Sequence, residues 1–277
     1  FRSERSHILM QRNTTPTVGG FRVNQYANYG IVNNHGVDMS LNIHQQIGKV
    51  KLSARGTFTY ARNKIVEYDE LPQRYPWMAQ TGMRINENYL YIAERLYTKE
   101  DFIVSKNGSG IETYTLRSEL PQSTLGGLLG PGDIKYKDQN GDNRIDSEDR
   151  VAIGKSTAVP EMVYGLNLGF EYRGIGIDMV FNGISGLTKQ LNVANVHRPL
   201  RNGNTNIATW YLKDKVRWTE QTKDIANLPR LSTLSNENNY QASTQWIADG
   251  SFFKLRTLNV HLSLIHISEP TRRTPIS

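Results

Sequence analysis

The chain has 277 residues, no cysteine and a formal net charge of +7. The absence of cysteine excludes disulfides, thiolate catalysis and cysteine-ligated metal centres, and the scattered lysines and arginines, without a basic helix or groove, do not indicate nucleic-acid binding. No apolar run approaches the roughly 18 residues of a transmembrane helix, although the alternating strands of a membrane barrel would not produce such a run.

Two adjacent segments near the N-terminus alternate apolar and polar residues. Segment 37–46 does so first, and segment 49–60 repeats the pattern after a short turn at 46–48. Period-2 alternation indicates a strand with one apolar face and one polar face. We therefore expect a β-hairpin from 37 to 60.

Oxygen-bearing side chains recur at calcium-loop spacing in segment 138–149. With Asp138 as position 1, they occupy positions 1, 3, 5, 9 and 12, and the carbonyl group at position 7 could add a ligand. Glycine stands at position 4 instead of 6, and position 12 is aspartate instead of glutamate, so the segment is closer to a dockerin-type loop than to an EF-hand. The candidate ligands of a structural calcium ion are Asp138, Asn140, Asp142, Arg144, Asp146 and Asp149.

The same segment admits a second interpretation. Asn140, Gly141 and Asp142 are residues typical of a tight turn, in which the carboxylates are solvated or cap nearby backbone N–H groups. The sequence leaves both interpretations open.

A second hairpin is expected after this loop. Segments 164–172 and 175–181 alternate apolar and polar residues on either side of a turn at Arg173 and Gly174. Each alternating run is close to the roughly 9–11 residues with which a tilted strand crosses a bilayer.

The connections between these strands are very unequal in length. The turns have two or three residues, whereas long connections cover about 64–160 and about 185–248. Outer-membrane barrels have short periplasmic turns and long extracellular loops, and long structureless loops are uncommon in compact soluble domains. We therefore predict an all-β fold, with roughly five or six antiparallel strands of a partial transmembrane β-barrel and long extracellular loops. The alternative is a secreted calcium-binding β-sandwich that binds glycans.

In the barrel interpretation, alternation assigns each strand residue to the lumen or to lipid. The residues expected to face the lumen are Lys49, Lys51, Arg55, Glu171 and Asp178. Those expected to face lipid are Leu52, Phe58, Leu166, Leu168, Ile177 and Met179.

The two ends of the sequence affect where the domain is drawn. The chain begins at Phe1 without a signal peptide, so we expect an internal part of a longer protein. Segment 262–277 is similar to the translation of a transposon-type sequencing adapter, so we place the partial barrel at residues 1–261 and assign no function to the tail.

Several blocks also occur in the order found in one transporter family. The chain resembles the SusC/RagA family of TonB-linked outer-membrane transporters over about residues 15–261, with Asp38 where the family pattern has glutamate. The blocks are NYG at 28–30, GVD at 36–38, GDIKYKD at 132–138, NGD at 140–142, YGLN at 164–167, RWT at 217–219, LPRL at 228–231, NY at 239–240 and WIADGSFFKLR at 246–256.

This resemblance implies a function that composition alone would not. It implies import of oligosaccharides, or less often peptides, across the outer membrane, driven by TonB through an N-terminal region that this sequence does not contain. It also implies a SusD-like surface lipoprotein as partner.

The sequence contains no recognisable catalytic motif. The histidines form no H-E-x-x-H pair, and Gly154-Lys155-Ser156 fails as a phosphate-binding loop because Asp149 stands where the first glycine is needed. We expect that the protein is not an enzyme.

Overall fold

The computed structural model describes residues 1–13, 18, 20, 23, 25–106, 108, 110–191, 217–234 and 236–262. Across these residues the secondary structure consists of β-strands and short 3-10 turns, without an α-helix. No helix there is long and apolar enough to cross a membrane. Nearly all of the adapter-like tail, 263–277, lies outside the described residues.

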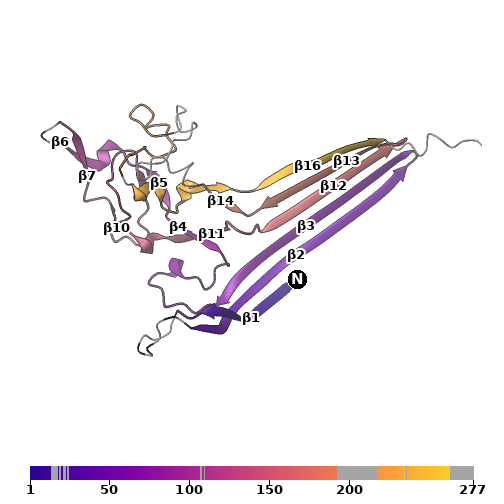
Figure 1. Ribbon diagram of the computed structural model, residues 1–277, viewed down its shortest axis with the longest axis horizontal. Coiled ribbons are helices and arrows are strands. Elements are labelled where there is room, and N and C mark those ends of the chain that lie inside the picture. Colours follow the sequence, from indigo (N-terminus) through magenta and orange to yellow (C-terminus); the bar gives the residue numbers. More distant parts are fainter. Residues whose placement is uncertain are drawn as a thin grey trace, which may run out of the picture.

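The main element is a six-stranded antiparallel sheet with the strand order β1-β2-β3-β12-β13-β16 (Figure 1). This architecture agrees with the predicted all-β class. The strands are β1 (Arg2–Gln11), β2 (Tyr26–Ile47), β3 (Val50–Glu67), β12 (Met162–Tyr172), β13 (Ile175–Ser185) and β16 (Phe252–Leu262).

The short turns lie together at one end of this sheet. Gly48 and Lys49 connect β2 to β3, and Arg173 and Gly174 connect β12 to β13. Val50 pairs with Ile47 before the first turn and with Tyr172 before the second, so the two turns lie side by side. Gly48, Arg173 and Gly174 have φ values of 60°, 49° and 84°, as two-residue hairpin turns require.

Two sequence predictions need correction here. The first hairpin is longer than expected, because β2 begins at Tyr26 and β3 ends at Glu67. Lys49 was expected on the lumen-facing side of a strand, but it lies in the turn. Glycine at position 48 adopts a positive φ without a steric cost, so the turn consists of Gly48 and Lys49 and not of residues 46–48.

The sheet is a single layer with one apolar face. Residues 39, 58, 164 and 253 lie in one row across the strands on that face, as the strand register shows. The rows closer to the turns also consist mostly of apolar residues. Half or more of the surface is exposed at Leu41, Ile43, Leu258 and Val260. In the described part of the chain no second sheet covers this face, and the sheet is not closed into a barrel.

The long connections form a separate body at the opposite end of the sheet (Figure 1). We call the described residues of 68–161 and 186–251 the loop assembly. Its strands are β4 (Glu87–Leu90), β5 (Ala93–Leu96), β6 (Phe102–Lys106), β7 (Glu112–Leu116), β8 (Gln122–Ser123), β9 (Ile134–Tyr136), β10 (Arg144–Ile145), β11 (Val151–Ser156), β14 (Thr188–Gln190) and β15 (Ile247–Asp249). Its 3-10 turns are Pro76–Met78, Lys99–Asp101, Ser147–Asp149, Glu237–Tyr240 and Thr244–Trp246.

The hydrophobic core lies in this loop assembly and not behind the sheet. Its buried residues are Tyr91, Ile134, Tyr136, Ile145 and Trp246. Because they come from both long connections, the core joins segments that are far apart in the sequence. The described parts of the long connections therefore form one structural unit at one end of the strands.

Candidate functional site

The calcium-like segment forms a tight loop whose side-chain oxygens accept hydrogen bonds from its own backbone. Asp138 accepts from the amides of Gly141 and Asn143 at 2.7 and 2.8 Å. Asn140 accepts from the amide of Asp142 at 3.0 Å. Gly141 and Asn143 have φ values of 76° and 62°, a left-handed conformation that glycine and asparagine adopt most readily. The NGDN sequence therefore suits this turn locally.

The second half of the loop repeats this kind of contact. Asp142 accepts from the amide of Arg144 at 2.9 Å. Asp146 accepts from the amide of Glu148 at 2.8 Å and so caps the 3-10 turn Ser147–Asp149. These carboxylates satisfy backbone donors at the beginning of turns.

Asp149, the last predicted ligand, is almost completely buried. Its two oxygens accept from the amides of Gln139 and Asp146 at 2.7 and 2.9 Å, which ties the two ends of the loop together. Burial raises the pKa of Asp149, and the amide hydrogen bonds offset part of this rise. Its role in this geometry is to close the loop.

The six predicted ligands thus lie in one loop, but the side-chain oxygens of Asp138, Asn140, Asp142, Asp146 and Asp149 accept from backbone amides. Among the described residues, no three His, Cys, Asp or Glu side chains are arranged to hold a metal ion. The hydrogen bonds agree with the second interpretation of the sequence, in which the carboxylates cap N–H groups. Calcium binding stays a prediction.

The loop is attached to the rest of the loop assembly through Glu148. The carboxylate of Glu148 pairs with Arg74 at 3.0 Å, and its backbone carbonyl accepts from the indole N–H of Trp77 at 2.9 Å. Trp77 in turn stacks on Tyr75, with ring centroids 4.6 Å apart. The acidic loop therefore positions an aromatic segment from the first long connection.

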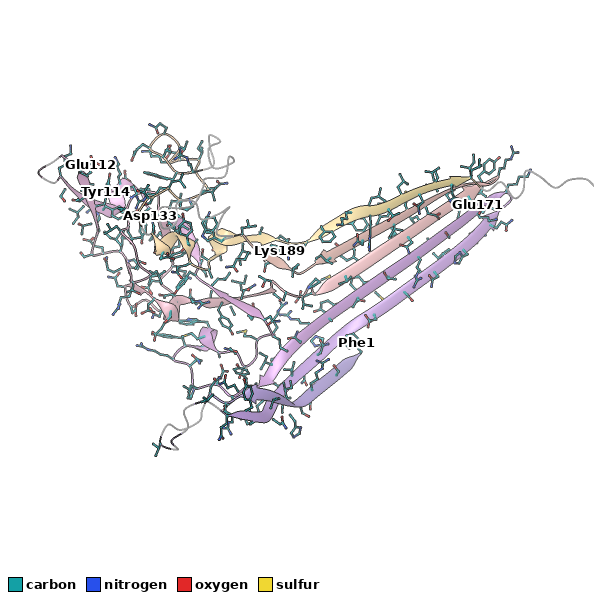
Figure 2. The ribbon with its side chains drawn as sticks, viewed as in Figure 1. Phe1, Glu112, Tyr114, Asp133, Glu171 and Lys189 are labelled. Atoms are coloured by element: carbon teal, nitrogen blue, oxygen red, sulfur yellow. The ribbon has the colours of Figure 1, made fainter. Side chains whose placement is uncertain are left out.

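A buried ion pair joins the two long connections. Asp133, with no exposed surface, accepts from Nε and Nη2 of Arg230 at 2.8 and 2.9 Å. It also accepts from the side-chain amides of Asn236 and Asn239, both at 2.8 Å, and from the backbone of Gly130. Every carboxylate oxygen is paired, as a buried charge requires. Figure 2 shows Asp133 in the loop assembly, far from Glu171 at the turn end of the sheet.

Two neighbouring asparagines extend this junction. Asn239 Oδ1 accepts from the amide of Ile134, and Asn238 Nδ2 donates to the carbonyl of the same residue. The hydroxyl of Tyr136 donates to the carbonyl of Asn238, and the indole N–H of Trp246 donates to that of Asn239. The side chains of Asn238 and Asn239, from a 3-10 turn, thus satisfy the backbone N–H and C=O groups of Ile134 in β9.

The sequence reasoning missed this junction as a site. Asp133, Arg230 and Asn239 occur within the family-like blocks, but Asp133 is about a hundred residues away from the other two. The available signal was an acidic residue beside an apolar strand. If such a residue is buried it needs a charged or hydrogen-bonding partner, but the sequence does not show which residue this is. Only the folded connections identify Arg230 as that partner.

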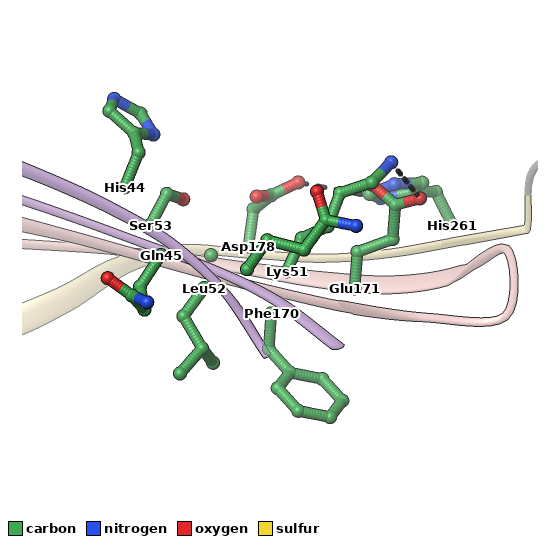
Figure 3. Close-up of a pocket in the computed structure, with 11 residues that line it drawn as sticks. His44, Gln45, Lys51, Leu52, Ser53, Phe170, Glu171, Asp178 and His261 are labelled. Carbon is green, nitrogen blue, oxygen red and sulfur yellow. Dashed lines mark hydrogen bonds and ion pairs between the residues drawn. The ribbon is translucent and has the colours of Figure 1, made fainter. Parts of the chain in front are cut away.

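On the polar face of the sheet, charged side chains gather near the short turns. Lys51 pairs with Glu171 at 3.0 Å, and Asp178 pairs with His261 at 3.4 Å. They line a cavity of about 420 Å³ (Figure 3). In the same view Leu52 points to the opposite side of the sheet. The charged and apolar residues are therefore separated onto two faces, as their alternation in the sequence predicts.

Aromatic residues border the apolar face at both ends. Towards the loop assembly, Phe253 contacts Tyr164 and Phe181, with ring centroids 5.8 and 5.5 Å apart. Towards the turns lie Phe170 and Tyr172. From Tyr164 to Tyr172 the strand extends about 26 Å, or about 20 Å in height at a tilt near 40°. This is close to the roughly 25 Å apolar band of outer-membrane barrels, which is flanked by aromatic girdles.

A single-layered antiparallel sheet with an exposed apolar face, short turns at one end and long connections at the other is the strand arrangement of outer-membrane β-proteins. Comparison with solved structures supports this class. The chain is similar to a chain in a structure of the RagAB peptide transporter, with a TM-score of 0.57 and 19% sequence identity over 94% of this chain and 25% of that one. At this identity the likeness concerns the fold.

The sequence comparison points to a relation with TonB-dependent transporters. The chain is 25% identical over 168 residues to the TonB-dependent receptor P26 of Formosa agariphila, which covers 60% of this chain and 16% of that receptor. No family model matches the sequence. The chain thus spans about a sixth of its curated relative and a quarter of the solved one.

Proposed function

We propose that this chain is part of a TonB-dependent importer that carries nutrients across the outer membrane. The observation that carries the proposal is the exposed, continuous apolar face of the six-stranded sheet, bordered by aromatic residues. Exposure of such a face to water would be unfavourable, whereas in a bilayer the same face can contact the lipid chains. The apolar face then contacts lipid, and the face with Lys51 and Glu171 lines the interior.

The loop assembly belongs on the extracellular side in this proposal. Short turns are periplasmic in outer-membrane barrels, and the long connections lie at the other end of the strands. The buried Asp133–Arg230 pair joins the described parts of these connections. An extracellular body is suited to binding cargo and a partner.

We further propose that the protein belongs to the SusC/RagA branch of these transporters. The ordered blocks in the sequence support this assignment, and several of them supply residues of the junction around Asp133. TonB would supply the energy, a SusD-like lipoprotein would cover the extracellular end, and the cargo would be an oligosaccharide or a short peptide. One relative is named a receptor and the other a transporter, so we propose import without catalysis.

The secreted β-sandwich is the less favoured alternative. A sandwich buries its apolar face against a second sheet about 10 Å away. In the described residues the remaining sheets have two strands each, and the core lies in the loop assembly. The apolar face of the six-stranded sheet would have no protein layer to cover it.

The proposal is tested with the full-length receptor gene in its own host. We expect its deletion to abolish growth on one group of oligosaccharides or peptides, and removal of TonB to have the same effect. The receptor should fractionate with the outer membrane and co-purify with a lipoprotein. A receptor recovered from the medium without detergent, or cargo uptake that is independent of TonB, would contradict the proposal.

A further inference from the structure

A second cavity, of about 460 Å³, lies where β1, β2 and β3 meet the first long connection. This volume is within the range of small-ligand sites. Most of the side chains that the strands contribute are aliphatic and carry no hydrogen-bonding atom. The principal apolar lining residues are Ile8, Leu9, Met10, Val32, Ile65 and Ile85.

Irregularities in β1 help to form this cavity. The register with β2 shifts on both sides of Ile8, and His7 has a φ of 55°. A bulge turns side chains away from regular alternation, so that Ile8, Leu9 and Met10 all reach the cavity. Gly30, opposite Ile8, contributes no side chain, and a Cβ there would lie 3.1 Å from the end of Met10.

The register shows which face of the sheet carries the cavity. Asp38 pairs with Thr59 on the polar face. Counting in steps of two along the same ladder, Val32 pairs with Ile65 on that face as well, before the register shift at Ile31. The cavity is thus an apolar pocket on the polar side of the sheet, opposite the exposed apolar band. Lipid would contact the other face.

The charged groups at the cavity are predominantly acidic. Glu67, Glu87 and Arg84 line it. Arg84 is already engaged by two carboxylates, with Nη2 2.8 Å from Glu161 and Nε 3.5 Å from Glu87. Glu161 also lies 3.8 Å from Nε of Arg62. Three carboxylates, those of Glu67, Glu87 and Glu161, therefore face the two guanidinium groups of Arg62 and Arg84. The remaining negative charge favours a ligand bearing a positive charge.

We propose that this cavity binds an apolar side chain of a peptide cargo that carries a cationic group next to it. The proposal rests on the import function above and selects peptides over oligosaccharides for this position. The side of the cavity formed by the first long connection carries the polar residues Tyr68, Gln80, Asn86 and Tyr89, whereas the wall from β1, β2 and β3 is mostly aliphatic. A sugar has hydroxyl groups on most of its carbons, and those that face the aliphatic wall would be left unpaired. A leucine-like side chain fits such a wall, and a lysine beside it can approach Glu67.

Equilibrium binding of three pentapeptides to the purified full-length receptor, with any lipoprotein that co-purifies, tests this. The peptides are GLKGG, GSKGG and GLEGG. We expect GLKGG to bind about tenfold more tightly than GSKGG, because a buried leucine side chain is lost. GLEGG should bind about fivefold more weakly than GLKGG. Equal binding of GLKGG and GSKGG, or no binding of GLKGG, would overturn the assignment.

Two matched variants locate the site. Ile85→Asn removes part of the cavity wall at a partly exposed position, and Ile103→Asn makes the same change on β6, away from the cavity. Only Ile85→Asn should weaken GLKGG, by about fivefold, and reduce its preference over GSKGG. A photo-leucine form of GLKGG should label residues 8–10 or 85. Labelling elsewhere, or equal effects of the two variants, would refute the cavity as the binding site. The import function is tested separately, by whether cargo uptake depends on TonB.

Discussion

The carboxylate of Asp133 holds the guanidinium group of Arg230 by two hydrogen bonds, of 2.8 and 2.9 Å, across 97 positions of sequence. One residue belongs to each long connection. Asp133 is fully buried, so this pair links the two connections beside the hydrophobic core that they share.

We expect Arg230→Met to destabilise the loop assembly by about 3 kcal/mol, because it leaves the Asp133 charge buried without its cation. The asparagine donors and the amide of Gly130 remain hydrogen-bonded to Asp133. The expected cost is therefore at the lower end of the roughly 3–5 kcal/mol that removal of one partner from a buried ion pair causes. Pulse proteolysis of the full-length receptor measures the change. Arg74→Met is the control, since its pair with Glu148 is exposed to solvent and should contribute little to stability. Similar losses in both variants would show that the buried pair has no special role.

The two faces of β12 should respond differently to an arginine. Leu168 lies midway between the aromatic rows on the apolar face, and Asn167 lies on the polar face. Leu168→Arg should cost about 2–4 kcal/mol in a bilayer, and Asn167→Arg should cost less than about 1 kcal/mol. Urea unfolding of the full-length receptor in phospholipid vesicles compares them. If both positions tolerate arginine equally, the apolar face does not contact lipid.

The Asp101 side chain should make the stability of the loop assembly depend on pH. Burial alone would raise the pKa of Asp101, but the hydrogen bonds from Arg95 at 2.6 and 2.7 Å and from the amide of Thr98 outweigh it and hold that pKa below its usual range. A lowered pKa means that the folded state favours the carboxylate. Its stabilising contribution is therefore present above the ordinary aspartate pKa of about 4 and is lost as pH falls through the lowered value.

Asp101→Asn should accordingly reduce stability by about 2 kcal/mol at pH 7, with a smaller difference from the wild type near pH 3. Hydrogen exchange of the loop assembly at the two pH values provides the measurement. Asp224→Asn, at an exposed position, should change little at either pH. A pH-independent difference for Asp101→Asn would indicate a packing effect instead of a charge effect.

Calcium should protect segment 138–149 if the sequence pattern marks a binding loop. Arg144 is exposed within it and offers a cleavage site for trypsin. We expect calcium, with an affinity on the order of 10⁻⁴–10⁻³ M, to slow this cleavage relative to EDTA. Asp142→Asn should remove the difference, since it removes one predicted ligand charge. Equal cleavage rates of the wild type in calcium and EDTA would leave the carboxylates with the capping role that their hydrogen bonds show.

Part of the fold could be predicted because it depends on local patterns. Alternation identified the strand pairs on either side of Arg173 and Gly174, and it separated Lys51 from Leu52. A further strand was implied after the connection predicted to end at about 248, and β16 begins at Phe252, but no alternation was assigned to it. Arg256 forms a bulge between the register partners of Val180 and Phe181. The bulge shifts the apolar residues from odd to even positions and so breaks the period-2 pattern.

The candidate site was less accessible to sequence reasoning. The six acidic-loop residues were identified by spacing, but spacing does not determine whether their oxygens meet an ion or backbone amides. The cavity beside Gly30 depends on bulges in β1 and on a segment from the first long connection. Neither follows from periodicity, since each requires knowing which strands are neighbours.

The sequence by itself determined which residues share a face, because successive side chains of a strand point to opposite sides whatever the strand pairs with. It also determined the tight turns at Gly48 and Gly174, where the backbone needs a positive φ. Only the tertiary structure decided that Asp133 meets Arg230, that the core lies in the loop assembly, and that the sheet has no second layer in the described residues. These features depend on contacts between distant segments, and buried charges and apolar side chains can be satisfied by many partners until folding selects one.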